Sequence, residues 1–215
     1  MDFICVGTGS PDIIKTVHAI KRTGVKINLL GFLDDNSVNS TRELYGYPFL
    51  GGISELEKYS SSVAVFNSVF RNCEVREKVH TKLNRFTENY INLIHPSADI
   101  DGAVIFGSGV YIASGVRLGM GASVGSHSMI MDNATIAHDT SIGNCCFLGA
   151  GAHIQGHVIV EDKVFIGSGA VVCPSLRIGS NSVIGVNSAV MRSVPKSSIT
   201  FSEPARVIKN EKRNG

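Results

Sequence analysis

One histidine stands directly beside an acidic residue in a stretch of the chain that carries little charge. Residues 94–190 hold only 9 charged side chains, against 21 in residues 1–93, and within the low-charge stretch His138 is followed by Asp139. An imidazole takes up a proton near neutral pH, and an adjacent carboxylate can orient the ring and raise its basicity. The residues alone leave three roles open for His138: a general base, a metal ligand or a solvent-exposed side chain.

Candidate binding residues of another kind lie near the N-terminus. The apolar run Phe3–Val6 ends in the turn Gly7–Ser10, and backbone N–H groups at such a strand-to-helix turn favour phosphate. Asp12 stands where a dinucleotide-binding turn has its third glycine, so a plain glycine turn is an equal alternative. Asp34 and Asp35 end a second apolar run, where a ribose or base contact is expected, and a solvated loop is the alternative there.

The low-charge stretch repeats every six residues. Seventeen successive positions at this spacing are all large and apolar. A six-residue period fits neither an amphipathic helix nor a half-buried strand, and it is the signature of a hexapeptide β-helix, in which three hexapeptides form one triangular coil. The seventeen positions are Ile94, Ile100, Phe106, Ile112, Leu118, Val124, Ile130, Ile136, Ile142, Leu148, Ile154, Val160, Ile166, Val172, Ile178, Ile184 and Val190.

The other positions of the repeat also have a pattern. The residue two before each apolar one is mostly small and is expected to point inward, and the residue after it is often glycine, which we expect to relieve a tight corner. Three hexapeptides make 18 residues, so His157 is expected beside Asp139 in the next coil. We expect His127, His153 and His157 to be ordinary side chains without a chemical role.

Strands and helices alternate in the N-terminal third of the chain. Short apolar runs predict strands, and apolar residues at helical spacing predict helices between them. The second helix is expected over Glu74–Phe86, with Val75, Val79, Leu83 and Phe86 on its packed face. This alternation is typical of a small Rossmann-like parallel α/β sheet. The expected strands are residues 3–6, 27–32 and 63–66, and the first helix has apolar residues from 13 to 20 and stops at Gly24.

The composition changes sharply near residue 93, which indicates two architectures. We expect a Rossmann-like domain over residues 1–92, a parallel β-helix over 93–195, and a C-terminal cap or tail over 196–215. A net charge of +2 argues against a nucleic-acid partner, and the absence of a long apolar run argues against a membrane span. Five cysteines without metal-like spacing and an N-terminus unlike a signal peptide predict a reduced, cytoplasmic protein.

Several motifs along the chain carry a resemblance to a known family: GTGS at 7–10, GFLDD at 31–35, LIHPSA at 93–98, TIAHDTSIGN at 135–144, VFIGSGAVV at 164–172 and EPAR at 203–206. The chain resembles the sugar O- and N-acetyltransferases of the NeuD/PglD type. The resemblance implies an α/β + β fold, with a small Rossmann-like domain followed by a left-handed parallel β-helix, assembled as a homotrimer. It also implies acetyl transfer from acetyl-CoA, bound between neighbouring prisms, to a nucleotide-linked amino sugar in bacterial surface-glycan or glycoprotein biosynthesis.

The resemblance also assigns roles residue by residue. It implies that His138 is the general base, that Asp139 is its acidic partner, and that no metal is needed. It implies contacts with the sugar substrate at Gly7, Gly9, Ser10, Asp34, Asp35, Arg71, Asn72 and Met131, and contacts with acetyl-CoA at Phe147, Gly149, Gly151, Gly156, Gly167 and Gly169.

Some positions depart from the family pattern and keep two other functions open. Met131 stands where members often carry asparagine, Phe147 where they often carry a second histidine, and Ser10–Pro11 where they often carry Gly-His. One alternative is a catalytically altered trimer that only binds nucleotide sugars. The other is a metal-dependent hydratase like the γ-type carbonic anhydrases, which needs three histidines around one Zn²⁺; His153 and His157 lack the right spacing and a convincing third ligand.

Overall fold

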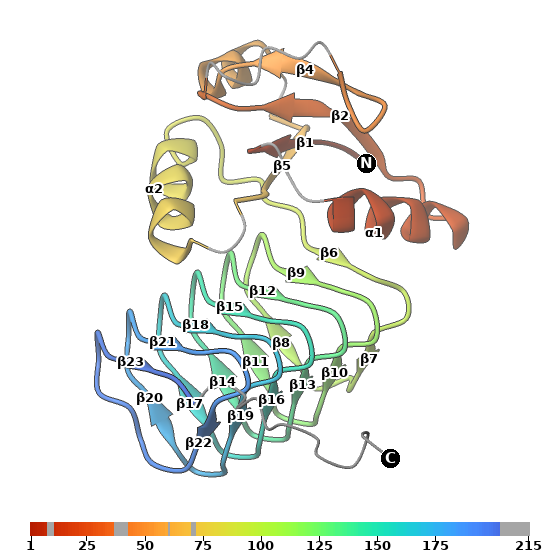
Figure 1. Ribbon diagram of the computed structural model, residues 1–215. Coiled ribbons are helices and arrows are strands. Elements are labelled where there is room, and N and C mark those ends of the chain that lie inside the picture. The colour runs from red at the N-terminus through yellow and green to blue at the C-terminus, as the bar shows by residue number, and fades with distance from the viewer. Residues whose placement is uncertain (8–10, 37–42, 60, 70–71, 203–215) are drawn as a thin grey trace, which may run out of the picture.

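The protein consists of a small α/β sheet domain seated on a triangular prism of stacked coils (Figure 1). The computed structural model describes residues 1–7, 11–36, 43–59, 61–69 and 72–202. The N-terminal sheet lies on the far side of this domain, and its two α-helices lie nearer the prism. Within the described residues, no helix combines the length and the hydropathy that a membrane crossing requires.

Five short strands form the N-terminal sheet in the order β3-β4-β2-β1-β5. All neighbouring pairs are parallel except β3 with β4. The three predicted strands correspond to β1, β2 and β5, with ends that differ by one residue, whereas β3 and β4 have no counterpart in the predicted pattern. The strands are β1 Asp2–Val6, β2 Asn28–Leu33, β3 Glu43–Leu44, β4 Tyr47–Gly51 and β5 Ala64–Asn67.

The helices of this domain follow the predicted pattern in position but only partly in burial. Helix α1 buries Ile13 and Val17 as predicted. In α2, however, Val75 is exposed, while Arg76 and Leu83 are fully buried. Leu83, Val79 and Phe86 pack against the core as predicted. The prediction is wrong at Val75 and does not include Arg76, which is buried because this helix contacts the prism as well as the sheet. The helices are α1 Pro11–Arg22, the 3-10 helix η2 Ile53–Lys58, and α2 Cys73–Leu83.

Three parallel sheets of two-residue strands form the faces of the prism, which is a left-handed β-helix as the resemblance implies. The first face contains β6 Leu93–Ile94, β9 Tyr111–Ile112, β12 Met129–Ile130, β15 Phe147–Leu148, β18 Phe165–Ile166, β21 Val183–Ile184 and β23 Ile199–Thr200. The second contains β7 Asp99–Ile100, β10 Arg117–Leu118, β13 Thr135–Ile136, β16 His153–Ile154, β19 Val171–Val172 and β22 Ala189–Val190. The third contains β8 Ile105–Phe106, β11 Ser123–Val124, β14 Ser141–Ile142, β17 Ile159–Val160 and β20 Arg177–Ile178.

Successive coils stack in strict register. Thr135 pairs with His153 and Ile136 with Ile154, so equivalent positions differ by 18 residues. In the middle of the prism the inward apolar side chains, such as Ile136, are completely buried, and so are the small residues two positions earlier, such as Ala134. We name the turn between the first and second faces the first corner, the turn between the second and third faces the second corner, and the turn that returns to the first face the third corner.

Two different positions of each turn allow the coils to stack closely. The glycine after the inward residue does not have a left-handed backbone, so the prediction that it relieves the corner is wrong. A Cβ on Gly125 would lie 2.5 Å from the carbonyl carbon of Gly143 in the next coil, so its role is to allow close backbone approach. The left-handed φ falls two residues later, where Asn133 (58°) and Lys163 (60°) adopt it as well as Gly121 (70°).

We expect Gly125→Ala to lower the free energy of unfolding by about 2 kcal/mol, because the added methyl group forces two coil backbones apart. Gly102→Ala is the matched control, since nothing lies within 4 Å of a Cβ built there, and a change below about 0.5 kcal/mol is expected. Urea unfolding followed by circular dichroism measures both variants. Equal destabilisation in the two variants would contradict the close-approach role.

Buried polar contacts fix the N-terminal domain to the prism. Tyr111 on the first face donates to the backbone carbonyl of Asp12 at 3.0 Å and lies 2.9 Å from Thr16 Oγ1 of α1. Arg76 of α2 is fully buried, and its Nη1 donates to the carbonyl of Cys146 at 2.9 Å, at the third corner. The same nitrogen lies 3.3 Å from the carbonyl oxygen of Cys145. Burying a guanidinium without acceptors is costly, so these two carbonyls hold α2 at one position on the corner.

Two imidazoles meet at the same corner. His127 of the prism is 2% exposed and lies against His80 of α2, with ring centroids 3.8 Å apart, while Tyr90 meets it edge-on at 4.6 Å. Burial, together with the nearby His80 and Arg76, lowers the pKa of His127 to about 3. Burial also lowers the pKa of His80, against an opposing effect of Glu77. Both rings are therefore neutral at pH 7.

This neutral pair makes the stability depend on pH. In the unfolded chain the pKa of His127 is about 6.5, whereas in the folded protein it is about 3. Between these pH values the unfolded state binds more protons than the folded state. The contribution of His127 to the free energy of unfolding is therefore fully present above pH 6.5 and is lost as the pH falls toward 3.

We expect His127→Asn to reduce the pH dependence of the unfolding free energy between pH 6.5 and 4 by up to about 1.4 kcal/mol per pH unit. Asparagine suits the left-handed backbone, as it does at Asn181, the equivalent residue three coils later. Urea titrations at several pH values measure the slope. The control His153→Asn changes an exposed histidine and should leave the slope as it is in the wild-type protein. If His127→Asn also kept the wild-type slope, the buried ring of His127 would not be the cause of the pH dependence.

Candidate active site

His138 and Asp139 occupy the second corner of the prism, between β13 and β14. His138 Nδ1 lies 3.0 Å from Asp139 Oδ2, and the two side chains are 59% and 56% exposed. An ionised carboxylate only accepts hydrogen bonds, so we assign the ring proton to Nδ1, which donates to Asp139. Nε2 then keeps its lone pair and can accept a proton from a molecule bound at this corner.

Glycines in the two neighbouring coils leave space for this pair. A Cβ on Gly121, one coil earlier, would lie 2.6 Å from Asp139 Oδ1. A Cβ on Gly156, one coil later, would lie 2.8 Å from His138 Nε2. Sequence reasoning missed Gly121 and gave Gly156 a different role, although each is 18 residues from the residue it accommodates. The coil period is therefore the signal that identifies them.

A second histidine adjoins the pair, as the spacing predicts. His157 Nδ1 lies 3.9 Å from Asp139 Oδ2, and its ring stands nearly perpendicular to that of His138, with centroids 4.9 Å apart. The backbone N–H of His157 donates to the carbonyl of His138 at 3.1 Å. Among the described residues, these three side chains form a group whose potential metal-ligating atoms all lie within 4.8 Å of one another.

Four of the predicted acetyl-CoA contacts form a column along the first corner. Gly149 and Gly167 are equivalent in successive coils, as are Gly151 and Gly169, which both have a left-handed backbone. A Cβ on Gly151 would meet nothing within 4 Å. Gly149 and Gly167 are buried between the coils, and of the four glycines only Gly151 and Gly169 reach the surface of this corner. Gly156 lies apart from this column, at the second corner.

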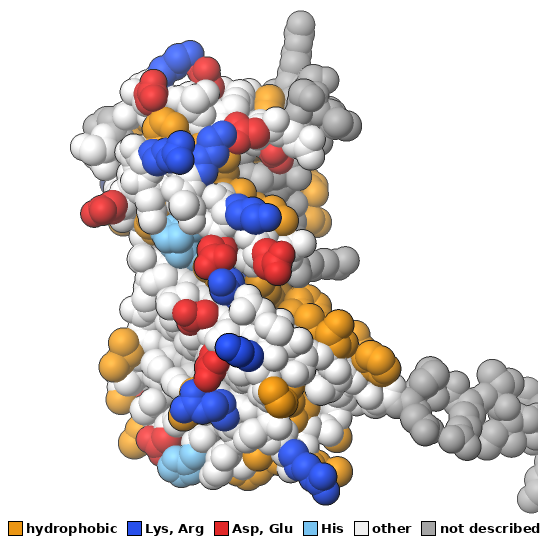
Figure 2. Space-filling model, turned by 90° about the vertical axis from the view of Figure 1, so that its left-hand side faces the viewer, with side chains coloured by type: hydrophobic (Ala, Val, Ile, Leu, Met, Phe, Trp, Pro, Cys, Tyr) orange, Lys and Arg blue, Asp and Glu red, His pale blue; other side chains and the backbone are white. Residues whose placement is uncertain are grey.

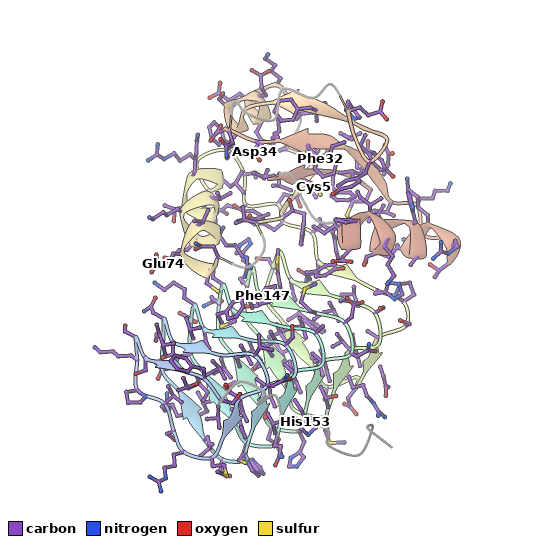
Figure 3. The ribbon with its side chains drawn as sticks, in the orientation of Figure 1. Cys5, Phe32, Asp34, Glu74, Phe147 and His153 are labelled. Atoms are coloured by element: carbon purple, nitrogen blue, oxygen red, sulfur yellow. The ribbon has the colours of Figure 1, made fainter. Side chains whose placement is uncertain are left out.

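Phe147 and Met131 lie away from the candidate base within one chain. Phe147 is on the first face, and its ring stacks on that of Phe165 at 5.1 Å with an interplanar angle of 6°. Figure 3 shows Phe147 on the side of the prism toward the N-terminal domain and His153 on a side that faces away from it. Met131 follows β12 and is also buried. Neither side chain meets His138, which lies at the opposite edge of the second face.

Gly7, the one described residue of the predicted phosphate turn, and Asp34 lie at one edge of the N-terminal sheet. The N–H of Gly7, at the end of β1, donates to the carbonyl of Leu33, at the end of β2. Asp34 follows directly and is labelled in Figure 3. Ser68 Oγ lies close to Gly7 and donates to the carbonyl of Val6 at 2.8 Å. This edge holds the carboxyl ends of parallel strands, where ligands bind in α/β sheets. The sequence pattern did not indicate Ser68.

Two predicted substrate contacts already have partners within the domain. Asp35 accepts hydrogen bonds from the Ile53 N–H at 2.9 Å and from Lys82 at 2.5 Å. Partial burial raises the pKa of Asp35, but these hydrogen bonds outweigh that effect and lower the pKa below its ordinary value. Asn72 caps α2, because its Oδ1 accepts the N–H of Val75. Three further predicted contacts, Gly9, Ser10 and Arg71, lie outside the described residues.

Known proteins share the repeat of the prism. Residues 121–156 match a family model described as bacterial transferase hexapeptide (six repeats). Serine acetyltransferase from Mycobacterium tuberculosis is 36% identical over 112 residues, which cover 51% of this chain and 44% of that protein. GDP-perosamine N-acetyltransferase from Escherichia coli O157:H7 is 30% identical over 107 residues, which cover 50% and 48%. The chain thus spans about half the length of these curated relatives.

A solved structure matches the chain over its whole length. A variant of GDP-perosamine N-acetyltransferase from Caulobacter crescentus, in complex with CoA and GDP-perosamine, is 25% identical, has a TM-score of 0.84 and covers 98% of each chain. The chain is similar to the hexapeptide-repeat proteins and shares their left-handed β-helix. Within them it has the two-part architecture of the NeuD/PglD-type sugar acetyltransferases, so the resemblance that its motifs predict is confirmed.

We expect Gly156→Ala to displace the imidazole of His138, because the new methyl group would overlap the position of Nε2. The ring nitrogen and carbon signals in NMR spectra, assigned by their loss in His138→Gln, should shift in Gly156→Ala. Gly102→Ala, in an open position, should leave them in place. Unshifted signals in Gly156→Ala would contradict the packing of this corner.

Proposed function

We propose that the chain is an acetyl-CoA-dependent acetyltransferase that acts on a nucleotide-linked amino sugar, with N-acetylation of a 4-amino sugar favoured. The observation that carries the proposal is the exposed His138–Asp139 pair on a hexapeptide prism that bears a parallel α/β sheet. It is supported by the solved relative of the same two-part fold, which holds CoA and GDP-perosamine. We place the reaction in the cytoplasm, in bacterial surface-glycan or glycoprotein sugar biosynthesis, which agrees with five free cysteines.

His138 acts as the general base in this proposal. Nε2 takes a proton from the sugar amine as its nitrogen attacks the thioester carbonyl carbon; a C–N bond forms, the C–S bond breaks, and the proton passes to the departing CoA sulfur. Asp139, 3.0 Å from Nδ1, keeps the ring in this tautomer and stabilises the imidazolium that forms. Gly121 and Gly156 keep the space around the pair open. No step requires a metal.

The acetyl-CoA site is proposed along the glycine column of the first corner. Within one chain this column and His138 lie at different edges of the second face, so one chain alone does not place both beside the same ligand. We therefore propose a homotrimer in which the first corner of one prism lies against the second corner of the next. Gly149, Gly151, Gly167 and Gly169 would line the groove, with Gly156 beside the base and Phe147 closing one side of it.

The nucleotide part of the acceptor is proposed to bind at the sheet edge formed by Gly7 and Asp34. Backbone N–H groups at a strand-to-helix turn attract phosphate. Asp35, Asn72, Met131 and the undescribed Gly9, Ser10 and Arg71 remain predicted contacts of the acceptor. Residues 1–92 would bind the nucleotide sugar, residues 93–195 would carry the transfer, and residues 196–215 would form a cap or tail.

A second candidate is a nucleotide-sugar-binding trimer that transfers no acetyl group. The observation that favours it is the ring of Phe147, which is packed on Phe165 and cannot donate a hydrogen bond to a thioester carbonyl. This candidate predicts that nucleotide sugars bind while acetyl-CoA is left intact, so one assay separates it from the enzyme.

The assay incubates the purified chain with acetyl-CoA and a panel of nucleotide-linked amino sugars, and follows the acetylated product by mass spectrometry. We expect product with at least one 4-amino sugar and a kcat about 10²–10⁴ lower in His138→Ala, because the base is lost. His153→Ala, which removes an exposed histidine elsewhere on the prism, should retain activity. Unchanged turnover in His138→Ala would refute the mechanism, and binding without product would favour the second candidate.

A further inference from the structure

The second corner carries one histidine, His157, that the proposed acetyl transfer does not use. His138, Asp139 and His157 bring two imidazoles and one carboxylate together, with ligating atoms all within 4.8 Å of one another. Each side chain is more than half exposed, so an ion can reach the group from solvent. The mechanism proposed above needs only the first two of these residues. The presence of His157 is therefore unexplained by that mechanism.

The stacked coils hold the backbone of the three residues in fixed relative positions. Asp139 and His157 both have a left-handed φ, 55° and 59°, at equivalent positions of successive coils. The N–H of Asp139 donates to the carbonyl of Met120 at 2.9 Å, and that of His157 donates to the carbonyl of His138 at 3.1 Å. Ligands attached to rigid elements lose little conformational freedom when they bind an ion. The site thus needs only side-chain rotation to converge on one.

The chemistry of the three groups selects the ion. Two neutral imidazoles and one carboxylate form the nitrogen and oxygen ligand set that Zn²⁺ accepts in tetrahedral geometry, with a fourth position left for water. Mg²⁺ prefers six oxygen ligands and loses its water reluctantly, so it fits this group poorly. This group of three potential ligands contains no thiol. Four of the five cysteines are buried.

We propose that the second corner binds Zn²⁺ through His138, Asp139 and His157 and that the ion acts as a reversible inhibitor of acetyl transfer. The inhibition rests on the proposed function, whereas the binding does not. Coordination through Nδ1 of His138 replaces the hydrogen bond to Asp139 and moves the ring proton to Nε2, which then cannot accept a proton. Coordination through Nε2 occupies its lone pair directly. Either arrangement removes the base.

Binding is tested without any acetyl donor, because free CoA carries a thiol that itself binds zinc. The full chain is titrated with ZnCl₂ in a calorimeter and with Co²⁺ in a spectrophotometer. We expect one ion per chain, with Co²⁺ absorption typical of tetrahedral nitrogen and oxygen ligands and without a thiolate charge-transfer band. His157→Gln should weaken the affinity by about tenfold or more, since losses of this size follow even from disturbing groups behind the ligands. His153→Gln, the matched control on the second face, should bind as the unchanged chain does.

Inhibition is then measured by mass spectrometry of the acetylated product, with EDTA added to reverse it. Without zinc, we expect His157→Gln to have the acetyltransferase activity of the wild-type protein. We also expect it to stay active at zinc concentrations that inhibit the wild-type protein and His153→Gln. The proposal is overturned if no ion binds, if His157→Gln binds as tightly as the unchanged chain, or if His153→Gln loses affinity equally. Zinc binding that depends on His157, in a chain that acetylates no sugar, would leave the site standing and refute the proposed function instead.

Discussion

Every feature of the prism depends on the backbone hydrogen bonds that stack each coil on the next in register. Because these bonds link residues 18 apart, an inward apolar side chain always rests on its equivalent in the next coil, as Ile136 does on Ile154. A shift by one residue would turn the apolar positions outward and the polar ones inward. The register therefore fixes the core, and through the core it fixes the corner on which each polar side chain stands.

The six-residue period allowed the prism and one part of its site to be predicted from the sequence. Simple addition places His157 beside Asp139, and the two side chains meet there. Hydrogen bonds that follow no period were not predictable: Tyr111 to the backbone of α1, and Arg76 to carbonyls of the third corner. The amphipathic pattern of α2 correctly placed Leu83 in the core but missed Arg76 for the same reason, since the pattern assumes one packed face and this helix packs against both a sheet and a prism corner.

The two halves of the chain obtain their rigidity in different ways. The prism gains it by repetition, with small and apolar residues filling a narrow core. The N-terminal domain depends on individual contacts, such as Ser68 against Gly7 and Lys82 on Asp35. On the face shown in Figure 2, charged side chains of both signs are interspersed across the described surface. In the proposed function, the repeated half would carry the reacting groups, and the irregular half would offer the variety of contacts that recognition of a particular acceptor requires.

The left-handed corner position has a consequence for how such a protein can change. Gly, Asn, Asp, His, Lys, Ser and Cys all occupy it somewhere along the prism with nearly the same φ, as Gly121, Asp139 and Cys145 illustrate. The side chain there projects from a backbone that the neighbouring coils already determine. Where it is exposed, as at Asp139 and His157, exchanging it alters the chemistry of one corner without removing a core contact. Glycine is required at this position where a side chain of the next coil fills the space, as Asp139 does beside Gly121. Reactive groups can in this way be gained or lost at the exposed corner positions through single substitutions. The scaffold therefore allows the chemistry of a corner to change while the register of the coils, and with it the core, stays the same.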